Sequence, residues 1–221
     1  MNISQRVTGI AAFVQGTALA ALLVCIGALL PRAGITSSDL FTPAKVLPAI
    51  HAPVLLLFYG LFPSFGVTLL LIVLGLASMM HSRERGLLRL ATLVAVAGLL
   101  VYAGFGLVGI GMIAMAGRAP DAAASVASAL GVLHVLFTVA PLAAITTTLW
   151  AWAAARTRTL PAALCTVVIV VSLLRLTAIF TQQPIVAMAQ LAGSVVWAWW
   201  IGIVLWQRRG NQATVGTRVT A

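Results

Sequence analysis

The sequence predicts an all-α fold, a six-helix transmembrane bundle, and two observations carry that prediction. Of the 221 residues, 62% are hydrophobic and 7% are charged, whereas a soluble domain carries about 25% charged residues. The charges also fall between long apolar segments, which approach or exceed the roughly 20 residues that a helix needs to cross a bilayer. The net charge of +10 therefore indicates membrane topology, and no nucleic-acid partner is expected because the arginines form no solvated basic face.

The first apolar segment, 7–30, is expected to be retained as a span. It is longer than the apolar core of a signal peptide and ends in Leu-Leu-Pro-Arg without a cleavage site. In the second segment, Pro53 and Pro63 are expected to kink the helix. The chain is read as a single transmembrane domain, residues 1–209, followed by a flexible tail at 210–221. The six spans are expected at 7–30, 49–80, 90–116, 123–154, 161–181 and 185–206.

Basic residues are distributed unequally between the two ends of these spans. With six spans, both termini lie on one side, and that side carries nine of the basic residues against three on the other. The positive-inside rule makes the richer side cytoplasmic. We therefore expect both termini in the cytoplasm of a bacterial cell, with the bundle in the plasma membrane. The richer side holds Arg6, Arg83, Arg85, Arg89, Arg156, Arg158, Arg208, Arg209 and Arg218, and the other holds Arg32, Lys45 and Arg118.

Arg175 is the candidate for a functional residue, because it lies inside the fifth apolar segment. A cation at membrane depth is costly and marks a functional site by default. Counted from Thr181, it lies roughly 9 Å below the outer end of its helix. Its planar guanidinium group suits a carboxylate or a phosphate. No acidic residue lies within any span, which disfavours a proton-coupled transporter.

Four further polar residues fall in the outer half of the bundle by the same counting. His134 and Thr138 share a face of the fourth span, Gln190 lies near the start of the sixth, and His51 lies at the mouth of the second. The functional hypothesis is a cavity in which they and Arg175 bind a small anionic or lipid-like ligand. The structural alternative is that Arg175 extends to the outer headgroups or pairs with Asp39 or Asp121, and that His134 is satisfied by ordinary packing.

Other functional classes are weighed on the same residues. Haem ligation by His51 and His134 is disfavoured because their depths differ by about 15 Å at 1.5 Å per helical residue, and no cofactor or metal is expected. Catalysis is disfavoured without being excluded, because no hydrolase, metalloprotease or paired-carboxylate motif is present. An accessory subunit stays open, since small residues follow one face of three spans and would also suit a membrane-protein partner. Examples are Gly16 and Ala20, Gly104 and Gly111, and Ala198 and Gly202.

The layout is similar to that of small bacterial six-span membrane proteins of unknown function. The shared features are Arg6 and Gly9 at the start of the first span, the long first outer loop, the Leu160-Pro161 entry to the fifth span, and the Gln207-Arg208-Arg209 exit from the sixth. The resemblance concerns segment lengths over most of the chain, and it implies no functional residue.

Overall fold

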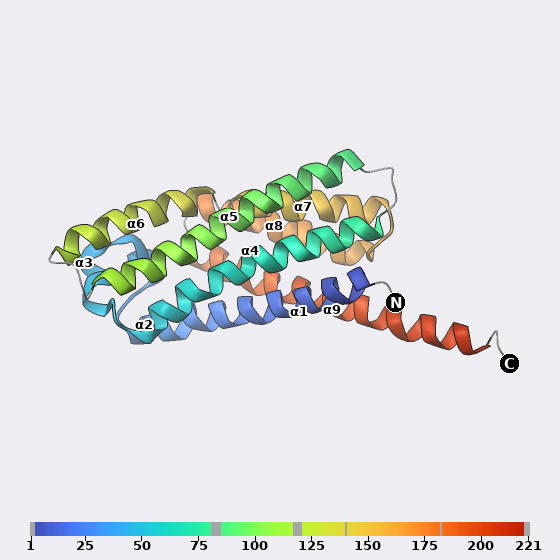
Figure 1. The fold of residues 1–221 in the computed structure, drawn as a ribbon, viewed down its shortest axis with the longest axis horizontal. Helices are drawn as coiled ribbons and strands as arrows, with labels where there is room; N and C mark the ends of the chain where they lie inside the picture. Colours follow the sequence, from blue (N-terminus) through green and yellow to red (C-terminus); the bar gives the residue numbers. More distant parts are fainter. Residues whose placement is uncertain (1–2, 81–84, 117–120, 140, 182, 219–221) are drawn as a thin grey trace.

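The protein is an elongated bundle of helices that run back and forth along one axis (Figure 1). The computed structural model describes residues 3–80, 85–116, 121–139, 141–181 and 183–218. Every element among these residues is a helix, which confirms the predicted all-α class for this part of the chain. Helix α1 begins and α9 ends at the same end of the bundle (Figure 1).

In the described part of the chain, seven long helices form the bundle, and five short ones form the connection between the first two of them. The long helices are α1 (Ile3–Val24), α4 (Pro53–Met79), α5 (Arg85–Ala116), α6 (Ala122–Val139), α7 (Pro141–Arg156), α8 (Ala162–Thr181) and α9 (Pro184–Arg218). The short ones are the π-helix η1 (Cys25–Leu29), α2 (Leu30–Arg32), η2 (Ser37–Phe41), α3 (Pro43–Val46) and η3 (Leu47–Ala49). The loop expected at 31–48 is therefore largely helical.

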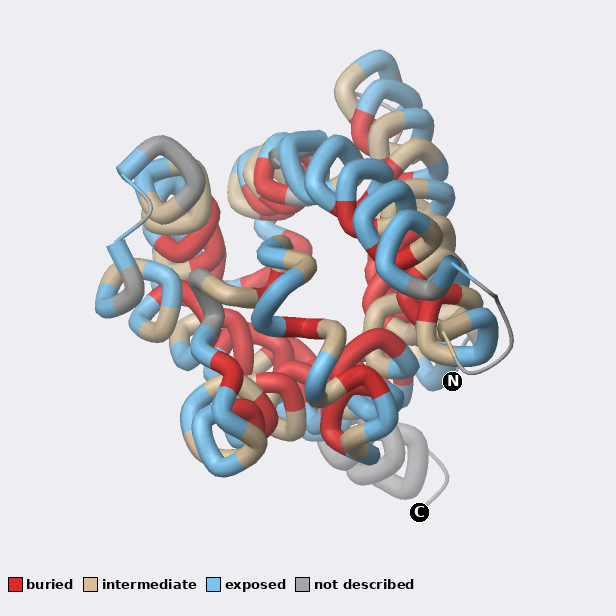
Figure 2. Tube along the Cα trace, turned by 90° about the vertical axis from the view of Figure 1, so that its left-hand side faces the viewer, coloured by how far each residue is buried: buried red, intermediate tan, exposed pale blue. Residues whose placement is uncertain are grey.

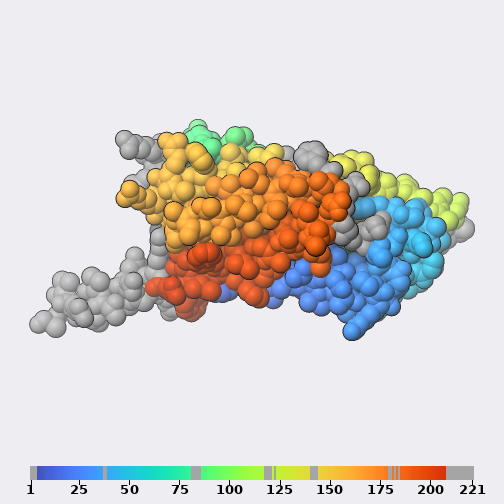
Figure 3. Space-filling model, turned by 180° about the vertical axis from the view of Figure 1, so that it is seen from behind, coloured from blue at the N-terminus to red at the C-terminus, as the bar shows by residue number. Residues whose placement is uncertain are grey.

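The long helices close into a ring. Helix α1 packs against α4 and α9, α5 packs against α4, α6 and α7, and α8 packs against α7 and α9. Seen along the bundle axis, the helices surround a centre that the segment before α4 crosses at one end, with buried residues facing inward (Figure 2). From behind, α7, α8 and α9 lie side by side (Figure 3).

The outer surface of the ring is apolar. On α5, Leu93, Leu100 and Leu107 point outward and are each more than 60% exposed. Five described segments are long and apolar enough to cross a membrane: 4–32, 53–79, 86–116, 123–156 and 185–207. The apolar stretch of α8, Ala162–Ala178, is shorter. The chain thus has several helices of the kind that multi-pass membrane proteins have, and the sixth span remains a prediction.

The start of the second span was placed wrongly, at a proline. The second span was expected from residue 49, but α4 begins at Pro53, where proline fits because the first helical residue needs no N–H partner. Pro53 therefore starts the helix and does not kink it, whereas Pro63 lies inside it. The fourth span was expected as one helix over 123–154, and the segment Ala123–Arg156 is long and apolar enough to form a single span. Residue 140, between α6 and α7, lies outside the described residues.

Several glycines mark close helix contacts within the bundle. A Cβ atom added at Gly106 on α5 would lie 2.8 Å from the carbonyl oxygen of Tyr59 on α4. Gly16 on α1 faces the ring of Trp199 on α9. The two example glycines of the third span differ: an added Cβ at Gly104 would lie 3.6 Å from Leu136, whereas nothing lies within 4 Å of one at Gly111. Part of the small-residue pattern is thus used for internal packing.

Candidate functional site

A cavity of about 220 Å³ lies at the centre of the ring, beneath η2. Its lining comes from α1, η1, η2, α4, α5, α6, α8 and α9, so segments distant in sequence meet there. The lining is mostly hydrocarbon and aromatic, and two of its residues, Phe137 and Ala187, are exposed at the surface of the bundle. A concave apolar site with few polar groups is the usual form of a ligand pocket.

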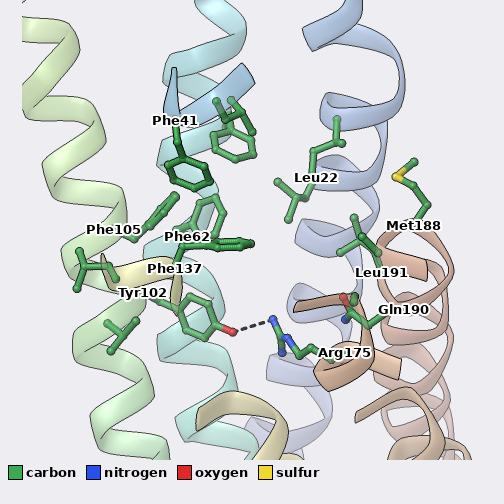
Figure 4. Close-up of a pocket in the computed structure, with 17 residues that line it drawn as sticks. Leu22, Phe41, Phe62, Tyr102, Phe105, Phe137, Arg175, Met188, Gln190 and Leu191 are labelled. Carbon is green, nitrogen blue, oxygen red and sulfur yellow. Dashed lines mark hydrogen bonds between the residues drawn. The ribbon is translucent and has the colours of Figure 1, made fainter. Parts of the chain in front are cut away.

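The aromatic part of the lining arises from helical spacing. Phe58 and Phe62 stand one turn apart on α4, and Tyr102 and Phe105 stand one turn apart on α5, which packs against α4. The rings of Phe62 and Phe105 lie 4.3 Å apart between centroids, and those of Phe58 and Phe62 lie 5.1 Å apart. Phe41 of η2 closes the cavity from the loop side (Figure 4). The phenylalanines of α4 thus serve both packing and the cavity wall.

Arg175 lines this cavity from α8 and reaches across it toward α5 (Figure 4). Its Nη2 atom donates a hydrogen bond of 2.8 Å to the hydroxyl oxygen of Tyr102. The guanidinium carbon also lies 6.0 Å from the centroid of the same ring. Among the described residues no carboxylate forms an ion pair with Arg175, so its partner there is a neutral phenol. The residue is half-buried and points into the bundle.

Gln190 is the second predicted residue that lines the cavity, and it is buried. Its Nε2 atom donates a hydrogen bond of 2.8 Å to the hydroxyl oxygen of Ser194, one turn later on α9. Ser194 in turn donates to the backbone carbonyl of Gln190, also at 2.8 Å. The structure therefore brings together two of the five predicted site residues, Arg175 and Gln190, on adjacent helices.

The other three predicted site residues do not line this cavity. His134 is exposed, and its ring meets the ring of Phe41 edge to face at 5.3 Å. Thr138 is exposed and donates to the carbonyl of Val135 on its own helix at 2.6 Å. His51 is exposed in the turn before α4. The sequence predicts how deep His134 and Thr138 lie along their helix. Whether their side chains point into the bundle depends on how α6 packs against the other helices.

The loop above the cavity is held by a local cap. The backbone nitrogen and the hydroxyl group of Thr36 donate to Asp39 Oδ2 at 2.9 and 2.6 Å. These bonds from Thr36 lower the pKa of Asp39, and Lys45 adds a smaller effect in the same direction. Asp39 thus orders η2, and with it Phe41, instead of pairing with Arg175. The other candidate, Asp121, accepts from the backbone nitrogen of Ala124 at 3.4 Å.

Sequence reasoning missed three residues of this region. Tyr102, the partner of Arg175, was hidden among the apolar residues of the third span, and Phe41 belonged to a loop whose position the sequence does not give. Gln15 on α1 is buried and faces the interior. The sequence could have identified Gln15 as a candidate, because an amide side chain inside an apolar span needs a polar partner.

Comparison with known proteins gives no further assignment, since no family model, curated protein or solved structure matches this chain. Among the described residues, no group of three or more His, Cys, Asp or Glu side chains is arranged to hold a metal ion. The two cysteines, Cys25 and Cys165, are buried and unpaired with each other. The function is therefore argued from the cavity.

Proposed function

We propose that the protein is a six-span membrane protein of the bacterial plasma membrane, with cytoplasmic termini, that holds a small amphipathic anion in the central cavity. The apolar outer faces and the unequal distribution of basic residues support the membrane placement. One observation carries the ligand class: Arg175 presents its charge to an apolar cavity, and its partner there is the neutral hydroxyl group of Tyr102.

The polar groups of the cavity are matched to an anion. A guanidinium group has five N–H donors, and among the described residues a single bond, to Tyr102, uses one of those on Arg175. An isolated cation at membrane depth costs about 3 kcal/mol or more, and an anionic ligand would offset that cost. The aromatic walls would bury the apolar part of the same molecule, and the volume of about 220 Å³ limits that part to a single ring or a short chain.

The test is the binding of benzenesulfonate, a permanently charged anion with one apolar ring, to the purified full-length protein in nanodiscs. Arg175→Ala is expected to weaken binding about 10- to 100-fold, because a hydrogen bond to a charged group contributes about 1.5–3 kcal/mol. Arg175→Lys should give a smaller loss, since the charge stays and the planar donor set is removed.

The matched control is Arg32→Ala, which removes an exposed arginine and should leave the affinity unchanged. Benzyl alcohol, which has the same ring without the charge, should bind more weakly than benzenesulfonate to the wild-type protein. Equal affinity of the wild type and Arg175→Ala for the anion would refute the proposal, and so would a wild type that binds neither benzenesulfonate nor hexanesulfonate.

A further inference from the structure

A second, smaller cavity continues the first one toward the opposite end of the bundle. Its volume is about 50 Å³. The two cavities share lining residues, among them Arg175 and Tyr102, so this pair stands at the junction between an outer and an inner chamber. A cavity needs about 10–15 Å³ to hold a single water molecule. The inner chamber therefore accommodates a group of a few heavy atoms, and a hydrocarbon ring or chain has to remain in the outer one.

The inner chamber differs from the outer one in chemistry. Besides Arg175 and Tyr102, its lining includes the side chains of Gln15, Thr147 and Ser194, from three different helices. All three are buried, with 5–6% of their surface exposed. Buried polar groups in a membrane protein are costly unless they are bonded. Polar side chains from α1, α7 and α9 that meet in one small space indicate a site for a polar group.

Gln15 is the residue of this set whose bonding is incomplete. Its side-chain carbonyl accepts a hydrogen bond from the hydroxyl group of Thr68 on α4. Its amide nitrogen, a donor of two hydrogens, has no acceptor among the described residues. Gln15 is only 6% exposed, and it lines the chamber. The amide of Gln15 on α1 and the guanidinium group of Arg175 on α8 thus offer donors to the same small space.

We propose that the inner chamber is the head-group subsite of the ligand, and this inference rests on the proposed function. The oxyanion of an amphipathic ligand, a carboxylate or a sulfonate, accepts hydrogen bonds from Arg175 and Gln15 in the inner chamber. Its hydrocarbon part extends into the outer chamber among the rings of Phe41, Phe62 and Phe105. The ligand is therefore oriented with its charge toward the bundle centre and its tail toward η2.

Two variants separate this orientation from the opposite one, with the anions ethanesulfonate and hexanesulfonate as probes. Gln15→Leu removes the amide and is expected to weaken both probes about fivefold or more, to the same degree. Phe41→Ala removes a ring near the tail end and is expected to weaken hexanesulfonate more than ethanesulfonate. With the reverse orientation, Gln15→Leu would leave hexanesulfonate binding unchanged or stronger, because leucine would then face the tail.

The matched control is Gln5→Leu, the same replacement on the same helix. Gln5 lines neither cavity and donates to the carbonyl of Leu205 at 3.5 Å, so both affinities should stay at the wild-type value. If Gln15→Leu fails to insert or fold, Gln15→Asn is the second variant. It keeps the amide on a side chain shorter by one methylene group, and it should give an intermediate loss of affinity.

The outcomes for this inference and for the proposed function are distinct. If Arg175→Ala weakens binding while Gln15→Leu and Gln15→Asn do not, the head-group subsite is refuted and the proposed function stands. If Arg175→Ala has no effect, the proposed function fails, and the subsite fails with it.

Discussion

The guanidinium group of Arg175 on α8 and the hydroxyl group of Tyr102 on α5 are joined by a hydrogen bond of 2.8 Å. The two residues are separated by 73 positions in the chain, and in the ring α7 lies between α5 and α8. The bond links α5 to α8 at the level where the two cavities meet. It therefore fixes the position of the single charged side chain in the cavity lining.

Tyr102→Phe is expected to destabilise the ligand-free protein by about 1.5–3 kcal/mol, the usual contribution of a hydrogen bond to a charged group. The phenyl ring stays, so the packing against Phe62 and Phe65 is retained. The measurement is thermal unfolding of the variant in nanodiscs. In an Arg175→Ala background the same replacement should have little further effect, since the bond is already lost. Additive losses in the double variant would show that the bond does not contribute.

Gly106→Ala is expected to separate α4 from α5 and to lower the free energy of unfolding by about 1–3 kcal/mol, as overpacking does. The added methyl group would lie 2.5 Å from Pro63 and 2.8 Å from the carbonyl of Tyr59, and the backbone cannot yield easily. Gly111→Ala on the same helix is the control, because nothing lies within 4 Å of its added Cβ. It should be neutral or stabilising by up to about 1 kcal/mol. Thermal unfolding of both variants compares the two sites.

Ser172→Ala tests the contact between α7 and α8. The hydroxyl groups of Ser172 and Thr147 lie 2.7 Å apart and are buried. Side-chain hydrogen bonds between membrane helices contribute about 0.6 kcal/mol on average and at most about 1.7, so a loss in that range is expected on unfolding. Thr166→Ala, an exposed residue of α8 that bonds within its own helix, should change stability less. An equal loss in both variants would argue against the interhelical bond.

The cap at Asp39 predicts a pH dependence of the loop over the cavity. Since hydrogen bonds from Thr36 lower the pKa of Asp39, the ionised carboxylate stabilises η2. This contribution is fully present above the ordinary aspartate pKa of about 3.9, and it is lost as the pH falls through the lowered pKa. Amide hydrogen exchange in residues 36–42, corrected for intrinsic rates, should therefore accelerate below about pH 4. Asp39→Ala should show fast exchange at neutral pH, whereas Asp121→Ala should leave this loop unchanged.

The orientation of the bundle is checked by cysteine labelling, in a protein whose Cys25 and Cys165 are replaced by alanine. Arg32 and Gln207 are exposed at opposite ends of the bundle. A membrane-impermeant maleimide should label Arg32→Cys in intact cells, and it should label Gln207→Cys only after lysis, because the positive-inside rule places Gln207 in the cytoplasm. The reverse pattern would invert the predicted topology.

The sequence predicted the helical class well because long apolar segments leave little choice of structure in a bilayer. It predicted the site in part. Arg175 and Gln190 stood out as polar residues in apolar spans, and the structure places them in one cavity. His134 was judged by depth alone, and the packing of α6 turns it outward. Tyr102 gave no signal because most of its side chain is an apolar ring and only the hydroxyl group is polar, and the approach of Phe41 depends on a loop fold that no periodicity encodes.

Helix α9 packs against α1, so a helix that is synthesised after the other six long helices described completes the enclosure. A chain that ends before Pro184 lacks α9. Gln15 on α1 is then no longer covered by the residues of α9 that line the same cavity. Closure of the ring therefore has to follow the synthesis of α9, and a premature stop codon upstream of α9 yields a fragment in which the polar interior of the ring is open on one side.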